Sequence, residues 1–126
     1  MHYELFLPFP PTINNYYVKT RNGQFISMKG KKFRAEAEAE VREQFPFSAL
    51  DGSLLVEVIL HMPDKRRRDL DNYMKPLLDA LTLAGVWEDD SQIDQLAIYR
   101  GTNTFGGSVR MRIHDAAPKL PPDYWP

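Results

Sequence analysis

A nearly continuous apolar run at residues 54–60, Leu-Leu-Val-Glu-Val-Ile-Leu, limits the possible folds more than any other feature. Such a run is typical of a strand in the middle of a sheet. Pro46 ends the helical pattern that precedes it, and a dense group of charges follows it. The sequence therefore predicts a sheet built around this strand, with functional residues on the loop after the strand.

Further periodic segments predict one domain of strands and two helices. The expected strands are residues 3–7, 16–19, 24–27, 93–99 and 109–113, and the expected helices are residues 28–45 and 72–84. Asn22 and Gly23 predict a hairpin, Ser27 predicts a helix N-cap, and Pro76 predicts a loose first turn or a kink in the second helix. We expect a turn packed under a strand at residues 12–17.

Composition narrows the class of protein. The chain has 126 residues, enough for one domain with a real core. It has no Cys, no apolar stretch long enough for a bilayer and no signal-peptide order at its N-terminus. We therefore expect a cytoplasmic protein with no membrane partner. Residues 1–115 are expected to form the domain, and residues 116–126, with four prolines, an irregular tail.

The charges after the apolar run are sorted by sign. Four cations, Lys65 to Arg68, come first, then Asp69 and Asp71, then Lys75. In an extended chain the two carboxylates point to one side, where a cation between them would relieve their repulsion. Mg²⁺ takes one or two carboxylates together with substrate phosphate, and arginines suit phosphate. The stretch predicts a metal site that acts on a phosphodiester.

A third acid comes from residues 88–90, Glu-Asp-Asp, and spacing alone does not choose among the three. Each residue also has a structural alternative. Asp71 suits a helix N-cap, Asp69 suits a local pair with Arg66 or Arg68, and the cations suit a solvated turn. Asp79 is expected to form a helix pair with Lys75. A net charge of −1 means that any nucleic-acid surface depends on local sorting of charge. The lysines at 29, 31 and 32 and the arginines at 110 and 112 are further candidates for it.

Several segments together resemble the RusA family of Holliday junction resolvases. These are residues 67–72 (Arg-Arg-Asp-Leu-Asp-Asn), Lys75, residues 78–82 (Leu-Asp-Ala-Leu-Thr) and residues 85–90 (Gly-Val-Trp-Glu-Asp-Asp). Residues 10–17, Pro-Pro-Thr-Ile-Asn-Asn-Tyr-Tyr, resemble the family's opening loop. The likeness extends from residue 3 to about residue 114.

The resemblance implies an α+β fold: a small mixed β-sheet with two helices in a single domain, paired as an intimate homodimer. It implies a Mg²⁺-dependent endodeoxyribonuclease of bacterial or prophage origin. Such an enzyme resolves four-way (Holliday) DNA junctions by paired, symmetric phosphodiester hydrolysis. Two alternatives remain: a junction-binding protein whose acids are structural, and a nuclease for flaps or other branched DNA.

The resemblance also assigns roles to residues. Asp69, Asp71 and Asp90 fall on the catalytic carboxylates that would hold the metal ion, and Lys75 falls on an essential lysine. Arg68 falls on a basic residue tied to DNA contact or catalysis, and Asn14 with Asn15 falls in a loop near the junction. The full set of expected DNA-binding residues is Lys65, Arg66, Arg67, Arg68, Asn14 and Asn15.

Overall fold

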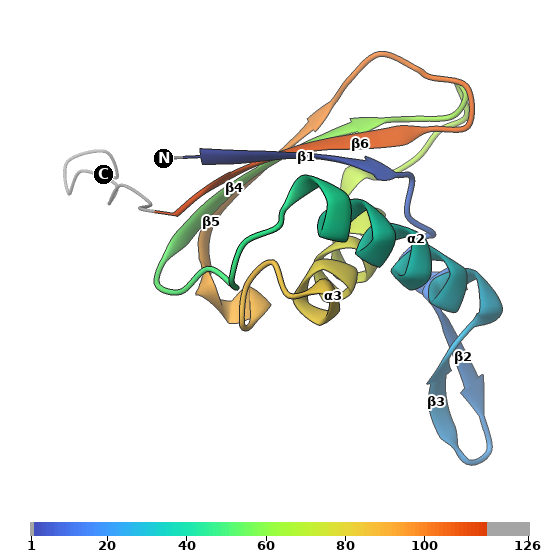
Figure 1. The fold of residues 1–126 in the computed structure, drawn as a ribbon. Helices are drawn as coiled ribbons and strands as arrows, with labels where there is room; N and C mark the ends of the chain where they lie inside the picture. Colours follow the sequence, from blue (N-terminus) through green and yellow to red (C-terminus); the bar gives the residue numbers. More distant parts are fainter. Residues whose placement is uncertain (1, 116–126) are drawn as a thin grey trace, which may run out of the picture.

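A four-stranded mixed sheet forms the centre of the computed structural model, which describes residues 2–115 (Figure 1). The strand order is β1-β6-β4-β5. The strands are β1 (His2–Pro8), β4 (Leu54–His61), β5 (Ile93–Arg100) and β6 (Ser108–His114). β4 pairs in parallel with β5 and antiparallel with β6, while β1 pairs antiparallel with β6. The apolar run is thus an internal strand, as predicted.

Two long helices, α2 (Met28–Gln44) and α3 (Met74–Ala84), lie on one face of this sheet (Figure 1). A hairpin of β2 (Tyr17–Thr20) and β3 (Gly23–Ile26) projects from the body. The expected count of two helices is wrong, because residues 2–115 contain a third, α1 (Ile13–Tyr16). It forms where the carbonyl of Thr12 accepts hydrogen bonds from the backbone N–H groups of Asn15 and Tyr16, at 3.0 and 2.9 Å. The predicted α+β class is confirmed.

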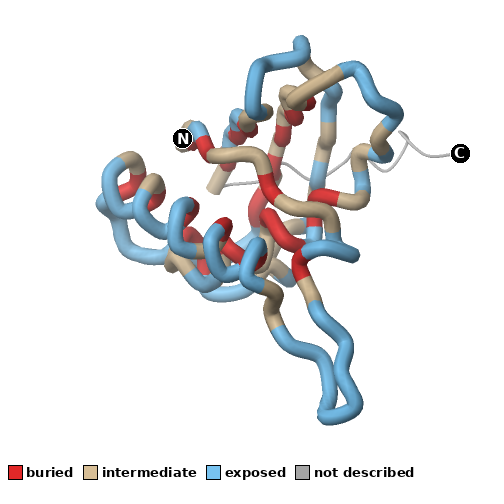
Figure 2. Tube along the Cα trace, turned by 90° about the vertical axis from the view of Figure 1, so that its right-hand side faces the viewer, coloured by how far each residue is buried: buried red, intermediate tan, exposed pale blue. Residues whose placement is uncertain are grey.

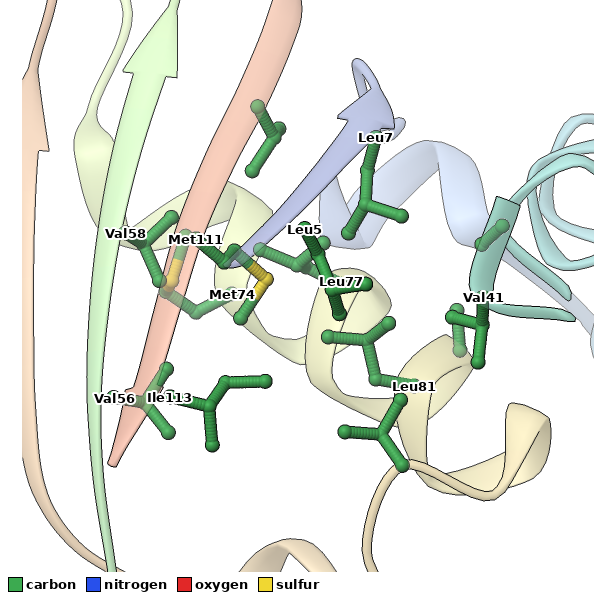
Figure 3. Close-up of a cluster of buried hydrophobic side chains, with 14 of the residues drawn as sticks. Leu5, Leu7, Val41, Val56, Val58, Met74, Leu77, Leu81, Met111 and Ile113 are labelled. Carbon is green, nitrogen blue, oxygen red and sulfur yellow. The ribbon is translucent and has the colours of Figure 1, made fainter. Parts of the chain in front are cut away.

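The core lies between the sheet and the two long helices. In β4 the side chains of Leu54, Val56, Val58 and Leu60 are buried and alternate with partly exposed ones. The helices meet them with two buried stripes, as the periodicity predicts (Figure 3). These stripes are Phe33, Ala37 and Val41 in α2, and Met74, Leu77, Ala80 and Leu81 in α3.

The opposite face of the sheet is not covered by any helix of the described chain (Figure 1). Leu55 and Ile59 of β4 are therefore only partly buried, and Phe6 and Tyr99 are more than half exposed, at 55% and 52%. The apolar run thus belongs to a strand buried on one side. Its second side contributes to a mixed apolar and charged surface.

The second predicted helix begins as a 3₁₀ turn, η1 (Leu70–Tyr73), and becomes α-helical at Met74. Pro76 lies in the first turn of α3, where a missing N–H group removes no helical hydrogen bond. The predicted loose start is confirmed. Gly85 ends α3 with a left-handed φ of 88° and donates to the carbonyls of Leu81 and Thr82.

Leu77→Ala is expected to lower the free energy of unfolding by about 2–5 kcal/mol, because Leu77 is fully buried between α3 and the sheet. Leu83→Ala, on the same helix but 63% exposed, is the control and should change it by about 0.5 kcal/mol or less. Urea denaturation of both variants checks this. Equal losses would contradict the packing described here.

Between residues 2 and 115, no helix has the length and apolar character that crossing a membrane requires. Residues 116–126 lie outside the described part of the chain. The expected irregular tail and the domain boundary at residue 115 therefore stay predictions.

Candidate active site

The loop after β4 is organised by Asp64. Its carboxylate accepts hydrogen bonds from the backbone N–H of Arg66 at 2.9 Å, from Nε of Arg66 at 3.3 Å and from Nη2 of Arg68 at 2.9 Å. The bond from the Arg66 backbone is the main reason why the pKa of Asp64 lies below its usual value. Both arginines thus pair with Asp64, and the alternative pairing with Asp69 does not occur.

Arg68 differs from its neighbours because its side chain is only 17% exposed. Its Nη1 donates to the hydroxyl of Tyr73 at 3.3 Å, and its carbonyl accepts from Nη2 of Arg100 at 2.8 Å. Nε of Arg68 is buried and has no hydrogen-bond partner within the described chain. Arg68 therefore fixes the loop against η1 and β5, whereas Lys65 and Arg67 are exposed to solvent.

Asp69 and Asp71 are exposed at the start of η1. Asp69 is extended, but the 3₁₀ turn begins at Leu70, so the extended chain considered above for residues 69–71 does not continue to Asp71. The helix-cap alternative for Asp71 fails too, because the N-cap residues are Asp69 for η1 and Tyr73 for α3. Within residues 2–115, no hydrogen bond or ion pair engages either carboxylate. Local structure therefore gives these two acids no role.

The second acidic cluster is divided by a short 3₁₀ turn, η2 (Asp90–Gln92). Asp89 is its N-cap and accepts from the backbone N–H of Ser91 at 3.2 Å. Hydrogen bonding to the side chain of Ser91, and next to its backbone, lowers the pKa of Asp89. Gln92 completes a capping box with Asp89. The carboxylate of Asp90 makes no hydrogen bond within the described chain, and its negative charge helps to raise the pKa of Lys75. Of the three acids, Asp89 is structural and Asp90 is free for another use.

Lys75 is held by a contact from α3 and, indirectly, by the hairpin. Its Nζ lies 3.2 Å from Oδ1 of Asp79, so the predicted helix pair is confirmed. The hydroxyl of Tyr17, in β2, donates to Oδ2 of the same Asp79 at 3.0 Å. The hydrogen bond to Asp79 is the largest cause of a raised Lys75 pKa, and Asp90 adds to it. Lys75 is therefore a cation over the whole physiological pH range, able to donate hydrogen bonds but not to act as a base.

The role of Tyr17 could not be read from sequence, because it lies 62 positions from Asp79. A hollow lined by Asn14, Tyr17, Lys19, Gln24 and Ile13 adjoins it. Asn14 and Asn15 lie on α1 with exposed side chains, and the Asn15 carbonyl accepts from the Ser27 hydroxyl at 2.5 Å. The opening loop, residues 10–17, therefore ends at Tyr17, which hydrogen-bonds to Asp79, the ion-pair partner of Lys75.

The predicted metal ligands can be tested against these contacts. In the described chain no three Asp, Glu, His or Cys side chains gather into a ready-made metal site, so the structure does not bring Asp69, Asp71 and Asp90 together as one. The chemistry of the donors nevertheless fits Mg²⁺: all three are carboxylates that no group within residues 2–115 neutralises by contact. Magnesium needs only one or two carboxylates when phosphate and water complete its shell.

Comparisons with known proteins agree on one family. The family model described as "Endodeoxyribonuclease RusA" matches residues 8–114. The chain is 39% identical over 111 residues to the "Crossover junction endodeoxyribonuclease rusA" of Enterobacteria phage HK97, covering 88% of this chain and 92% of that protein. It is 35% identical, with the same coverage, to the "Crossover junction endodeoxyribonuclease RusA" of Escherichia coli (strain K12). The match spans β4, β5 and β6, both long helices and all the acids above, so the chain belongs to the endodeoxyribonuclease RusA family.

Proposed function

We propose that this protein is a Mg²⁺-dependent endodeoxyribonuclease that resolves four-way DNA junctions by paired, symmetric phosphodiester hydrolysis. One observation carries the proposal: Asp69, Asp71 and Asp90 have no protein partner in the described chain, while Lys75 beside Asp90 is held as a cation. The names of the relatives, crossover junction endodeoxyribonucleases, support this substrate and reaction.

The three carboxylates would hold the metal ion. When bound, Mg²⁺ supplies Lewis-acid charge at the scissile phosphate and lowers the pKa of water. Asp69 and Asp71 come from the same turn after β4, and Asp90 comes from the turn before β5. Because η1 runs directly into α3 and η2 is closed by a capping box, these carboxylates are presented on ordered elements rather than on a long loop.

The cations near the carboxylates would have different roles towards the DNA phosphates. Lys75 lies on α3, and its ammonium group would stabilise the extra negative charge of the reacting phosphate. Exposed Lys65 and Arg67 would contact the phosphates on either side. Arg68 keeps the loop that carries them in one conformation, through Asp64 and Tyr73.

Cleavage on a set of branched DNAs tests the proposal. The protein is titrated with Mg²⁺ on a four-way junction, a flap and a linear duplex of the same sequence. We expect cutting of the junction on two opposed strands, with no cutting when the metal is chelated. Tight junction binding without cutting would favour the structural role for the acids, and faster flap cutting would favour the other branched substrate.

We further propose a two-fold homodimer, because a four-way junction offers two equivalent strands and a symmetric dimer presents two identical sites. The uncovered face of the sheet is the surface that we assign to the contact. It combines exposed Phe6 and Tyr99 with Arg110 and Arg112, whose guanidinium groups lie 3.2 and 3.0 Å from Glu4. Apolar residues beside arginines that already have an ion-pair partner suit self-association.

Tyr99→Arg is expected to convert the dimer into monomer, because it places a new cation on each copy beside existing arginines. Sedimentation velocity across a concentration series checks this, and paired cutting should fall to single nicks. Leu83→Arg, at an apolar position of α3 that is also more than half exposed, is the control that should remain dimeric. A monomeric unaltered protein with full resolving activity would contradict the dimer itself.

A further inference from the structure

The β2–β3 hairpin extends away from the rest of the molecule, and both its strands are exposed along almost their whole length (Figure 2). The strands pair in register, with Lys19 opposite Gln24 and Val18 opposite Phe25, and Arg21 lies in the turn. The hairpin contributes no side chain to the hydrophobic core. Its exposed surface is thus available for contacts with another molecule.

Charge on this part of the chain is one-sided. Between Glu4 and Glu36 there are six cations and no acid, although the whole chain carries a net charge of −1. The cations are Lys19, Arg21, Lys29, Lys31, Lys32 and Arg34. They belong to the hairpin and to the first two turns of α2, which follows it directly.

Few of these cations pair with an acidic group within residues 2–115. Lys19, Arg21, Lys29 and Lys31 are exposed, and within residues 2–115 none of them forms an ion pair. Lys32 has one long pair with Glu36 at 3.9 Å. Three lysines at a helix N-terminus are unfavourable for the helix dipole, so the protein alone gains nothing from this arrangement. An anionic partner would offset the cost.

The hairpin is joined firmly to the body at its base. The backbone N–H of Ser27 donates to the carbonyl of Tyr16 at 2.9 Å, and the hydroxyl of Ser27 caps α2 by accepting from Gly30. Gly30 packs so closely on Tyr16 that an added Cβ would lie 2.8 Å from the Tyr16 carbonyl oxygen. Tyr17, the first residue of β2, bonds to Asp79, the partner of Lys75. The exposed arm is therefore held in a set direction relative to the candidate active site.

We propose that the β2–β3 hairpin and the first turns of α2 form a second DNA-binding surface, which grips the phosphate backbone of a duplex arm next to the cleavage site. A two-stranded ribbon fits a DNA groove, and unpaired Lys and Arg release counterions when they meet phosphates. The inference rests on the proposed function, since it names a further surface for the same substrate. It places Lys19 and Arg21 against the arm, away from the catalytic carboxylates.

The test is the salt dependence of junction binding, measured in Ca²⁺ or without metal so that no cutting occurs. For the double variant Lys19→Ala/Arg21→Ala we expect weaker binding at every salt concentration. The slope of log affinity against log salt should be less steep by about 1 for each residue removed. Arg42→Ala, at the far end of α2, is the control and should keep the original slope. The variant should melt at the original temperature, because both side chains are exposed and unpaired.

The outcomes separate this inference from the proposed function. If the unaltered protein binds and cuts junctions but the double variant keeps its salt slope, the hairpin surface is wrong and the resolvase proposal stands. If the unaltered protein neither binds nor cuts junctions, both fail. If Val18→Ser/Phe25→Ser disperses an oligomer while the double variant keeps its slope, the hairpin is a contact between protein copies instead.

Discussion

Asp71→Asn is expected to bind four-way junctions at least as tightly as the unaltered protein and to cut them more slowly by a factor on the order of 10² or more. The substitution nearly keeps the size and shape of the side chain but removes one negative charge from the proposed metal ligands. Binding should hold or improve, because a carboxylate facing phosphate repels it. Parallel measurements of junction affinity and of single-turnover cutting with Mg²⁺ check this.

The structure makes this test cleaner than the sequence alone could. The Asp71 carboxylate is exposed, with no hydrogen bond or ion pair inside the described chain, so the change should leave the melting temperature where it is. A helix-capping aspartate would instead cost about 0.5–2 kcal/mol of stability when altered. Asp51→Asn, an exposed aspartate on the loop before β4, controls for the loss of charge. Normal cutting by Asp71→Asn would overturn the metal-site interpretation of residues 69–71.

Much of the fold follows from periodicity in single segments. The apolar run of β4, the stripes in α2 and α3 and the Asn-Gly turn are local patterns, and each segment formed close to its expected position. The exposed second face of β4 could not be predicted in the same way. Leu55 and Ile59 look like core residues in sequence, and only the placement of both long helices on one side leaves them partly exposed.

The candidate site likewise has features that local sequence predicts and features that depend on the fold. Sorted charge and strand-end position make Asp69, Asp71 and Lys75 candidates from sequence, because those signals lie within a dozen residues, whereas only the family resemblance selects Asp90. The partners of those residues did not follow from spacing. Asp64 accepts hydrogen bonds from the side chains of both Arg66 and Arg68, and Tyr17, on a strand distant in sequence, donates to Asp79. Such choices depend on which segments the sheet brings together.

The second large effect concerns Lys75, and it changes what should be expected of Asp79. Lys75→Ala is expected to cut on the order of 10²-fold more slowly, since it removes the cation proposed to stabilise the reacting phosphate, with at most a modest loss of binding. From sequence, Asp79→Asn, one turn away, is expected to be a mild stability change only. The structure shows instead that Asp79 accepts from both Lys75 and Tyr17. Asp79 is therefore a positioning residue for the lysine.

Asp79→Asn should consequently lower the cutting rate at saturating junction, by less than Lys75→Ala does, and leave junction affinity unchanged. Tyr17→Phe removes only the hydroxyl that orients Asp79, so its cutting rate should lie between those of Asp79→Asn and the unaltered protein.

An NMR titration of Lys75 supplies a readout that a purely structural role of Asp79 would not move. Because the Asp79 carboxylate raises the pKa of Lys75, Asp79→Asn should shift that pKa downward, whereas Asp51→Asn should not. The charged lysine is favoured below its ordinary pKa, and the pair's contribution is lost only as the pH rises through the raised value. If Asp79→Asn shifts the Lys75 pKa but cuts at the full rate, the lysine works without its anchor. If it slows cutting as expected, the Tyr17–Asp79 contact joins the hairpin arm to the lysine at the cleavage site.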